Sequence, residues 1–95
     1  MKERIFATAM QLAADKGIAA VTRNAVADKA SVATGSVSYH FDNVKKLQRA
    51  VVEQAIRDEN LAVLGWAVAE KHPSVQAGKL SEDLRRRALN KHLSR

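Results

Sequence analysis

The stretch TRNAVADKASVATGSVSYHFDNVKKL, residues 22–47, decides the fold. Thr22 is a suitable N-cap for a short helix whose apolar residues repeat at helical spacing. Residues 30–33 supply a tight turn, and a second short helix is expected from about Thr34 to His40. Two short helices across such a turn form a helix-turn-helix, which lays its second helix in the major groove of DNA. The stretch therefore predicts a DNA-binding unit.

A wider set of residues falls on one regular spacing without a gap: Ile5, Ala9, Leu12, Gly17, Thr22, Val26, Ala27, Ala30, Val32, Gly35, His40, Phe41 and Leu47. This spacing resembles the N-terminal DNA-binding domain of the tetracycline-repressor (TetR) family, over roughly the first half of the chain. Three residues depart from the family pattern: Ser31 stands for a turn glycine, Ala33 for a capping serine and Ser38 for an aromatic residue. We expect Tyr39 to take over the aromatic role and Thr34 to cap the recognition helix one residue late.

The recognition helix is expected to present hydroxyl and aromatic side chains to DNA, while its flanks hold the phosphates. Gly35 allows the backbone to approach the phosphates closely, and the resemblance implies that Lys45 or Lys46 binds a phosphate. His40 is explained equally well by a phosphate contact and by a structural hydrogen bond, whereas Phe41 is expected in the core. The complete set of expected DNA contacts is Arg23, Asn24, Thr34, Gly35, Ser36, Ser38, Tyr39, His40, Lys45 and Lys46.

The net charge of +6 indicates a polyanionic partner. The charge is +2 over residues 1–40, zero over residues 41–72 and +4 over residues 73–95. The basic tail is either a solvated helix face or a second, sequence-independent phosphate grip. Basic residues at the start of the chain are either an arm that reaches the duplex or a frayed end. These possible secondary contacts are Lys2, Arg4, Arg85, Arg86 and Arg87.

The periodicity of apolar residues predicts helices and no strands. The first expected helix runs from Glu3 to Lys16 and is ended by Gly17, and the two helices of the helix-turn-helix follow it. A long helix is then expected from about Val44 to Lys71, capped near Asp42 and Asn43 and ended by His72 and Pro73. After a loop at residues 73–79, the last helix is expected from Ser81 to Leu93. We divide the chain into a helix-turn-helix unit at residues 1–47 and a long helix plus basic C-terminal helix at residues 44–95, within one compact domain.

Residues 61–69, LAVLGWAVA, are apolar on every side, so this segment must be buried on every side. Because so short a chain is not expected to wrap the segment, a second copy is the favoured partner. Glycine allows two helices to approach closely, and tryptophan is a common interface anchor. The expected dimer interface comprises Leu61, Leu64, Gly65, Trp66 and Val68. The alternative is packing on the last helix, through Leu80, Leu84, Ala88 and Leu89.

The fold class is therefore all-α, and the function favoured is that of a homodimeric, sequence-specific DNA-binding protein, a transcriptional repressor at a palindromic operator. One alternative is an architectural or recombination-accessory DNA-binding protein. Another is an interaction module that sequesters a larger relative through residues 61–69. The chain has no cysteine, and His40, His72 and His92 lie singly in three segments. We therefore expect no enzyme activity, no cofactor and no metal site.

The chain is also expected to lack the small-molecule sensor that the resemblance implies for longer family members. Only about 48 residues follow Leu47, and two helices cannot enclose a pocket of several hundred cubic ångströms. We therefore expect no small-molecule ligand. The first 17 residues alternate charged with apolar side chains, unlike a signal peptide or a membrane span. A cytoplasmic location is expected.

Overall fold

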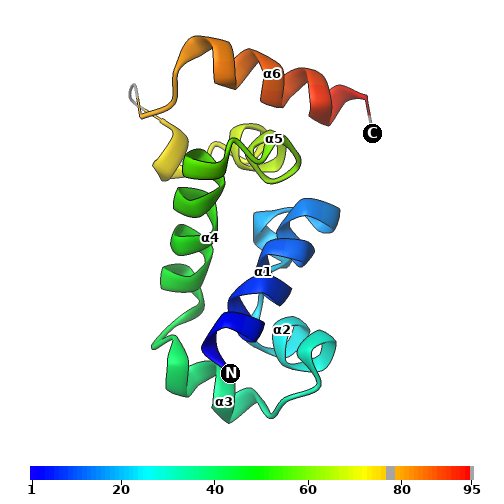
Figure 1. Cartoon of the computed structure of the whole chain (residues 1–95), viewed down its shortest axis with the longest axis vertical. Helices are drawn as coiled ribbons and strands as arrows, with labels where there is room; N and C mark the ends of the chain where they lie inside the picture. Colours follow the sequence, from blue (N-terminus) through cyan, green and yellow to red (C-terminus); the bar gives the residue numbers. More distant parts are fainter. Residues whose placement is uncertain (77–78, 95) are drawn as a thin grey trace.

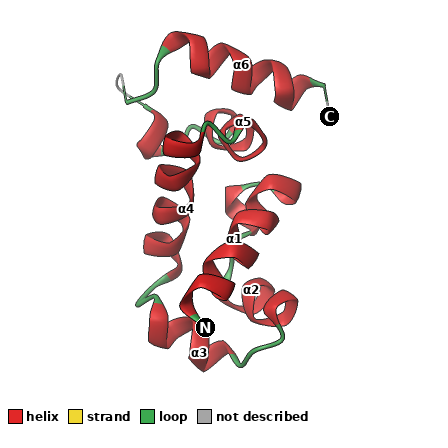
Figure 2. Cartoon of the chain, in the orientation of Figure 1, coloured by secondary structure: helices red, strands yellow, loops and turns green. Residues whose placement is uncertain are grey.

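The computed structural model describes residues 1–76 and 79–94, and within them every regular element is a helix (Figure 2). The elements are α1 (Lys2–Lys16), η1 (Ile18–Ala20), α2 (Arg23–Ala30), α3 (Thr34–His40), α4 (Val44–Asp58), α5 (Leu61–Ala69), η2 (Pro73–Val75) and α6 (Glu82–Leu93), where η marks a short 3-10 helix. This confirms the expected all-α class. Residues 77 and 78 of the expected loop and residue 95 of the basic tail lie outside the described residues.

The helix-turn-helix forms where the sequence places it. The Thr22 hydroxyl accepts a hydrogen bond from the Ala25 N–H at 3.1 Å, which confirms Thr22 as the N-cap of α2. Ser31 ends α2 in the left-handed region, at φ 59° and ψ 45°. That region favours glycine, which explains why a glycine suits this turn. The expectation that Thr34 caps α3 is wrong, because Thr34 is already helical and Ala33, which has no side-chain acceptor, is the N-cap.

The single long helix expected from Val44 to Lys71 is also wrong. Helix α4 ends at Asp58 because Glu59 adopts a left-handed conformation, with φ 52° and ψ 44°. The Asn60 side chain then accepts a hydrogen bond from the Val63 N–H at 3.3 Å and caps a new helix. The chain changes direction at this point, so that α4 runs along the molecule while α5 is seen nearly end-on (Figure 1).

Helix α5 is buried within one chain, between α1, α4 and α6. Leu64 is fully buried, and Gly65 lies so close to α6 that an added Cβ would be 2.8 Å from the Ala88 carbonyl oxygen. The reason for expecting a second copy here, that one chain cannot cover this segment, is therefore wrong. The alternative is confirmed for Leu80, Leu84 and Ala88, which are buried in the same core, whereas Leu89 is only partly buried. Of the expected interface residues, Leu61, Trp66 and Val68 remain partly exposed.

The side chains of Trp66 and Glu70 tie the end of α5 to α1 and η1. The Trp66 indole N–H donates to the Ala14 carbonyl oxygen at 3.0 Å, near the end of α1. The Glu70 carboxylate accepts hydrogen bonds from the Ile18 N–H at 2.7 Å and from the Ala19 N–H at 2.9 Å. These backbone amides belong to η1, which leads into α2. The last turn of α1 and the start of η1 are thereby held against α5.

We predict that Gly65→Ala destabilises the protein by about 1 to 3 kcal/mol, because the new methyl group must displace the backbone of α6. Gly35→Ala is the matched control, because a Cβ at Gly35 meets no atom within 4 Å. That control should stabilise α3 by about 0.5 to 1 kcal/mol through helix propensity. Chemical denaturation measures both changes. Equal stability of the Gly65 variant and the wild type would contradict the close packing of α5 on α6.

Candidate nucleic-acid interface

Helix α3 lies at one end of the molecule and α6 at the other, along the longest dimension of 39 Å (Figure 1). The inner face of α3 holds Val37, which is only 3 % exposed. The outer face presents Thr34, Gly35 and Tyr39 to solvent, and Tyr39 is 82 % exposed. A large aromatic side chain left in water on a short helix is available for an external partner.

The other polar residues expected on α3 are less accessible. Ser36, Ser38 and His40 are partly buried, so they lie at the sides of the exposed face of α3 and not at its centre. The His40 ring makes an edge contact with the Tyr39 ring, with ring centres 5.0 Å apart. Phe41 packs on the core, as expected, and its ring lies 6.4 Å from that of Phe6 in α1.

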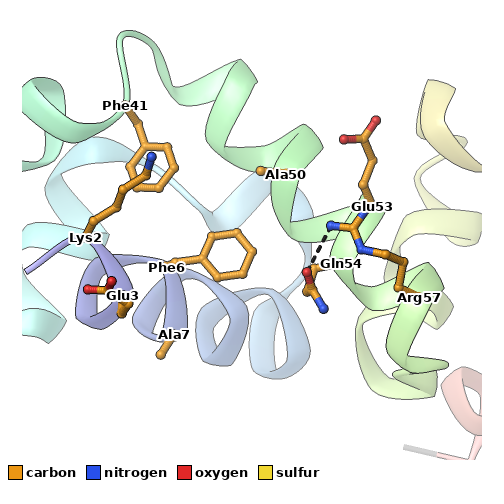
Figure 3. Close-up of a pocket in the computed structure, with 9 residues that line it drawn as sticks. All are labelled: Lys2, Glu3, Phe6, Ala7, Phe41, Ala50, Glu53, Gln54 and Arg57. Carbon is orange, nitrogen blue, oxygen red and sulfur yellow. Dashed lines mark hydrogen bonds between the residues drawn. The ribbon is translucent and has the colours of Figure 1, made fainter.

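The start of α1 lies beside the end of α3. The Lys2 ammonium lies 5.5 Å from the centre of the Phe41 ring, over its face (Figure 3). A cation at this distance from an aromatic ring is attracted by its electron-rich face. Lys2 and Arg4 are both exposed and already helical, since α1 begins at Lys2. Of the two, Lys2 is therefore placed next to the residue that follows the recognition helix.

Basic side chains gather where α4 begins. Asn43 caps this helix, its side-chain oxygen accepting a hydrogen bond from the Lys46 N–H at 2.9 Å. The Lys46 ammonium is 3.4 Å from the Asp42 carboxylate, so this ion pair already neutralises part of the positive charge of Lys46. A hollow of about 500 Å³ here is lined by Arg23, Asn43, Val44, Lys45, Lys46 and Arg49. Arg49 was not among the residues expected to contact DNA, although its four-residue spacing from Lys45 places both on one helix face.

The three arginines of α6 are at the opposite end of the molecule from α3 (Figure 1). The Arg85 guanidinium donates a hydrogen bond to the Val75 carbonyl oxygen. Arg86 and Arg87 both pair with Asp83, at 2.9 Å and 3.0 Å, and Arg87 also reaches Glu59 at 3.3 Å. These side chains therefore brace α6 and its neighbours within the chain.

A solvent-exposed second helix of a helix-turn-helix, next to a helix that begins with basic residues, is typical of DNA-binding proteins. Comparison with known families agrees, because residues 5–51 match the family of bacterial regulatory proteins called the tetR family. The chain therefore contains the N-terminal DNA-binding domain of the tetR family, and it is a DNA-binding transcription regulator. Comparisons with curated proteins and with solved structures gave no match. No helix in the described part of the chain is long and apolar enough to cross a membrane.

Proposed function

We propose that the protein is a dimeric repressor that reads a palindromic operator with α3. The observation that supports this best is the division of α3 into a buried face at Val37 and an exposed face at Thr34, Gly35 and Tyr39. The exposed face carries groups that approach bases and phosphates, and it has no competing role in the core. We propose that the residues expected to contact DNA do so. The main contacts are those whose side chains or backbone are exposed: Thr34, Gly35, Tyr39, Arg23, Asn24 and Lys45.

The flanking contacts are proposed to position the duplex instead of reading its sequence. Arg23 at the start of α2 and Lys45 near the start of α4 line the same hollow, and Asn24 is exposed beside Arg23. Helix starts favour anions because their first N–H groups have no partner within the helix. Lys46 is a weaker candidate, because Asp42 already neutralises part of its charge.

Dimerisation is proposed through α6, the helix that covers α5. Leu93 is 79 % exposed and Leu89 is partly buried, and both line a shallow hollow on the outside of α6. Two recognition helices reach successive major grooves when they are about 34 to 36 Å apart on one side of the duplex. A dimer of this kind must present both copies of α3 to the same side of the duplex.

The two alternative functions lose the features that favoured them. The architectural role was favoured in part by the basic tail, whose Arg85, Arg86 and Arg87 are engaged within the chain and far from α3. The sequestering role relied on an open apolar surface at residues 61–69, most of which is covered by α6. We therefore propose neither function.

We predict that Tyr39→Ala weakens operator binding by about 1 to 3 kcal/mol, the scale of one good contact in a DNA interface. Its thermal midpoint should stay within a few degrees of wild type, because Tyr39 is 82 % exposed. Val37→Ala is the matched control on the buried face and should lower stability instead. Binding to a duplex selected from a random pool, measured by fluorescence anisotropy, tests this. Unchanged affinity of the Tyr39 variant would overturn the assignment of the reading face.

We predict that Leu89→Lys combined with Leu93→Lys shifts the protein from dimer to monomer without unfolding it, because both side chains point outward on α6. A monomer binds a palindrome more weakly, since it loses the second half-site. Sedimentation equilibrium at micromolar concentration measures the oligomeric state. Lys91→Gln is the control on the same helix, because Lys91 is exposed and does not line this hollow. A wild-type protein that stays monomeric at high micromolar concentration would rule out the dimer.

A further inference from the structure

Two neighbouring hollows share the side chains of Lys45 and Arg49. The first, of about 500 Å³, opens toward Arg23 at the start of α2. The second, of about 320 Å³, opens toward Gln48, His72 and Pro73, well beyond the helix-turn-helix. Lys45 and Arg49 thus form a ridge along α4 between the two hollows. We call these two residues the α4 ridge.

The α4 ridge carries positive charge that the rest of the described chain leaves without a close partner. Neither hollow is lined by a carboxylate from the residues that the structure describes. Neither Lys45 nor Arg49 has an ion pair within 4.0 Å among the described residues, although Glu53 lies one turn further along α4. Like charges four residues apart on a helix repel each other. An external anion between the two side chains would relieve this repulsion.

The second hollow adds a neutral donor to these cations. The His72 Nδ1 accepts a hydrogen bond from the Ser74 N–H at 3.1 Å, which leaves Nε2 to carry the ring proton. Partial burial lowers the pKa of His72 below its ordinary value of 6.5; Arg49 lowers it further, while Glu70 and Glu53 oppose the shift. At neutral pH the ring is therefore an uncharged N–H donor beside the guanidinium of Arg49.

We infer that the α4 ridge is a phosphate-binding track, which carries the DNA backbone from the helix-turn-helix toward His72. This inference rests on the proposed DNA-binding function and adds Arg49 as a contact outside the reading helix. The two residues of the ridge are about 6 Å apart along the helix axis. One DNA strand carries a phosphate about every 3.4 Å along the duplex, so the ridge spans about two phosphates. The track reads no sequence and adds affinity to any duplex.

The salt dependence of DNA binding tests the track. Each neutralised phosphate contributes about 0.9 to the slope of log affinity against log salt. Arg49→Gln should therefore flatten the slope by about 0.9 per subunit and weaken binding to operator and random duplex by the same factor. Arg57→Gln is the matched control, because Arg57 lies two turns further along α4, exposed and hydrogen-bonded to Gln54 at 2.9 Å. The control should leave the slope unchanged, and both variants should keep the thermal midpoint of wild type.

The other outcomes separate this inference from the proposed function. An Arg49 variant with an unchanged slope, in a protein whose operator binding still depends on Tyr39, overturns the track alone. A wild-type protein that binds no duplex overturns both. Titration with inorganic phosphate distinguishes the two possible sources of the anion, the DNA backbone and a free phosphate ion. If millimolar phosphate shifts the amide signals of residues 45–49 while Arg49→Gln leaves DNA binding unchanged, the ridge is a site for small anions and the track is wrong.

Discussion

The whole fold depends on covering α5, a helix with no polar side. Residues 61–69 contain no charged side chain, so every face of this helix must be removed from water. Helices α1 and α4 cover part of it, and α6 covers a further part through the close approach at Gly65, which leaves Leu61, Trp66 and Val68 only partly exposed. The same helix then supports the DNA-binding half, because Trp66 binds the Ala14 carbonyl and Glu70 binds the amides of η1. The apolar helix is thus the common support of the two ends of the molecule.

That support matters because the recognition helix has little stability of its own. Helix α3 is seven residues long, has no side-chain N-cap and buries only Val37. Short helices are marginal in water unless tertiary packing holds them. Here Phe41 packs on the core beside Phe6 of α1 at the end of α3, while Val37 holds the inner face of α3 in the core. A small helix on a rigid scaffold can present exposed groups accurately without contributing much to the core.

The bounds of the helix-turn-helix could be predicted from the sequence because its signals are local, although the cap of α3 and the partial burial of Ser36 and Ser38 could not. Thr22 caps α2, Val26 and Ala30 face inward, and the exposed and buried sides of α3 follow from its spacing. The break at Glu59 and Asn60 was missed because apolar residues continue on both sides of it, and a left-handed non-glycine residue gives only a weak signal. Two features depend on how separate helices pack, which local periodicity does not encode. They are the burial of Gly65 and the lack of an ion pair at Arg49 among the described residues.

We propose that α3 and the start of α4 contact DNA while α6 stays away from it. Backbone amide NMR signals, followed during titration with a duplex selected from a random pool, distinguish these helices. We expect the largest shifts at residues 34–40 and 44–49, with those of residues 82–93 unchanged by DNA at constant oligomeric state. Large shifts centred on α6, with α3 unaffected, would contradict it.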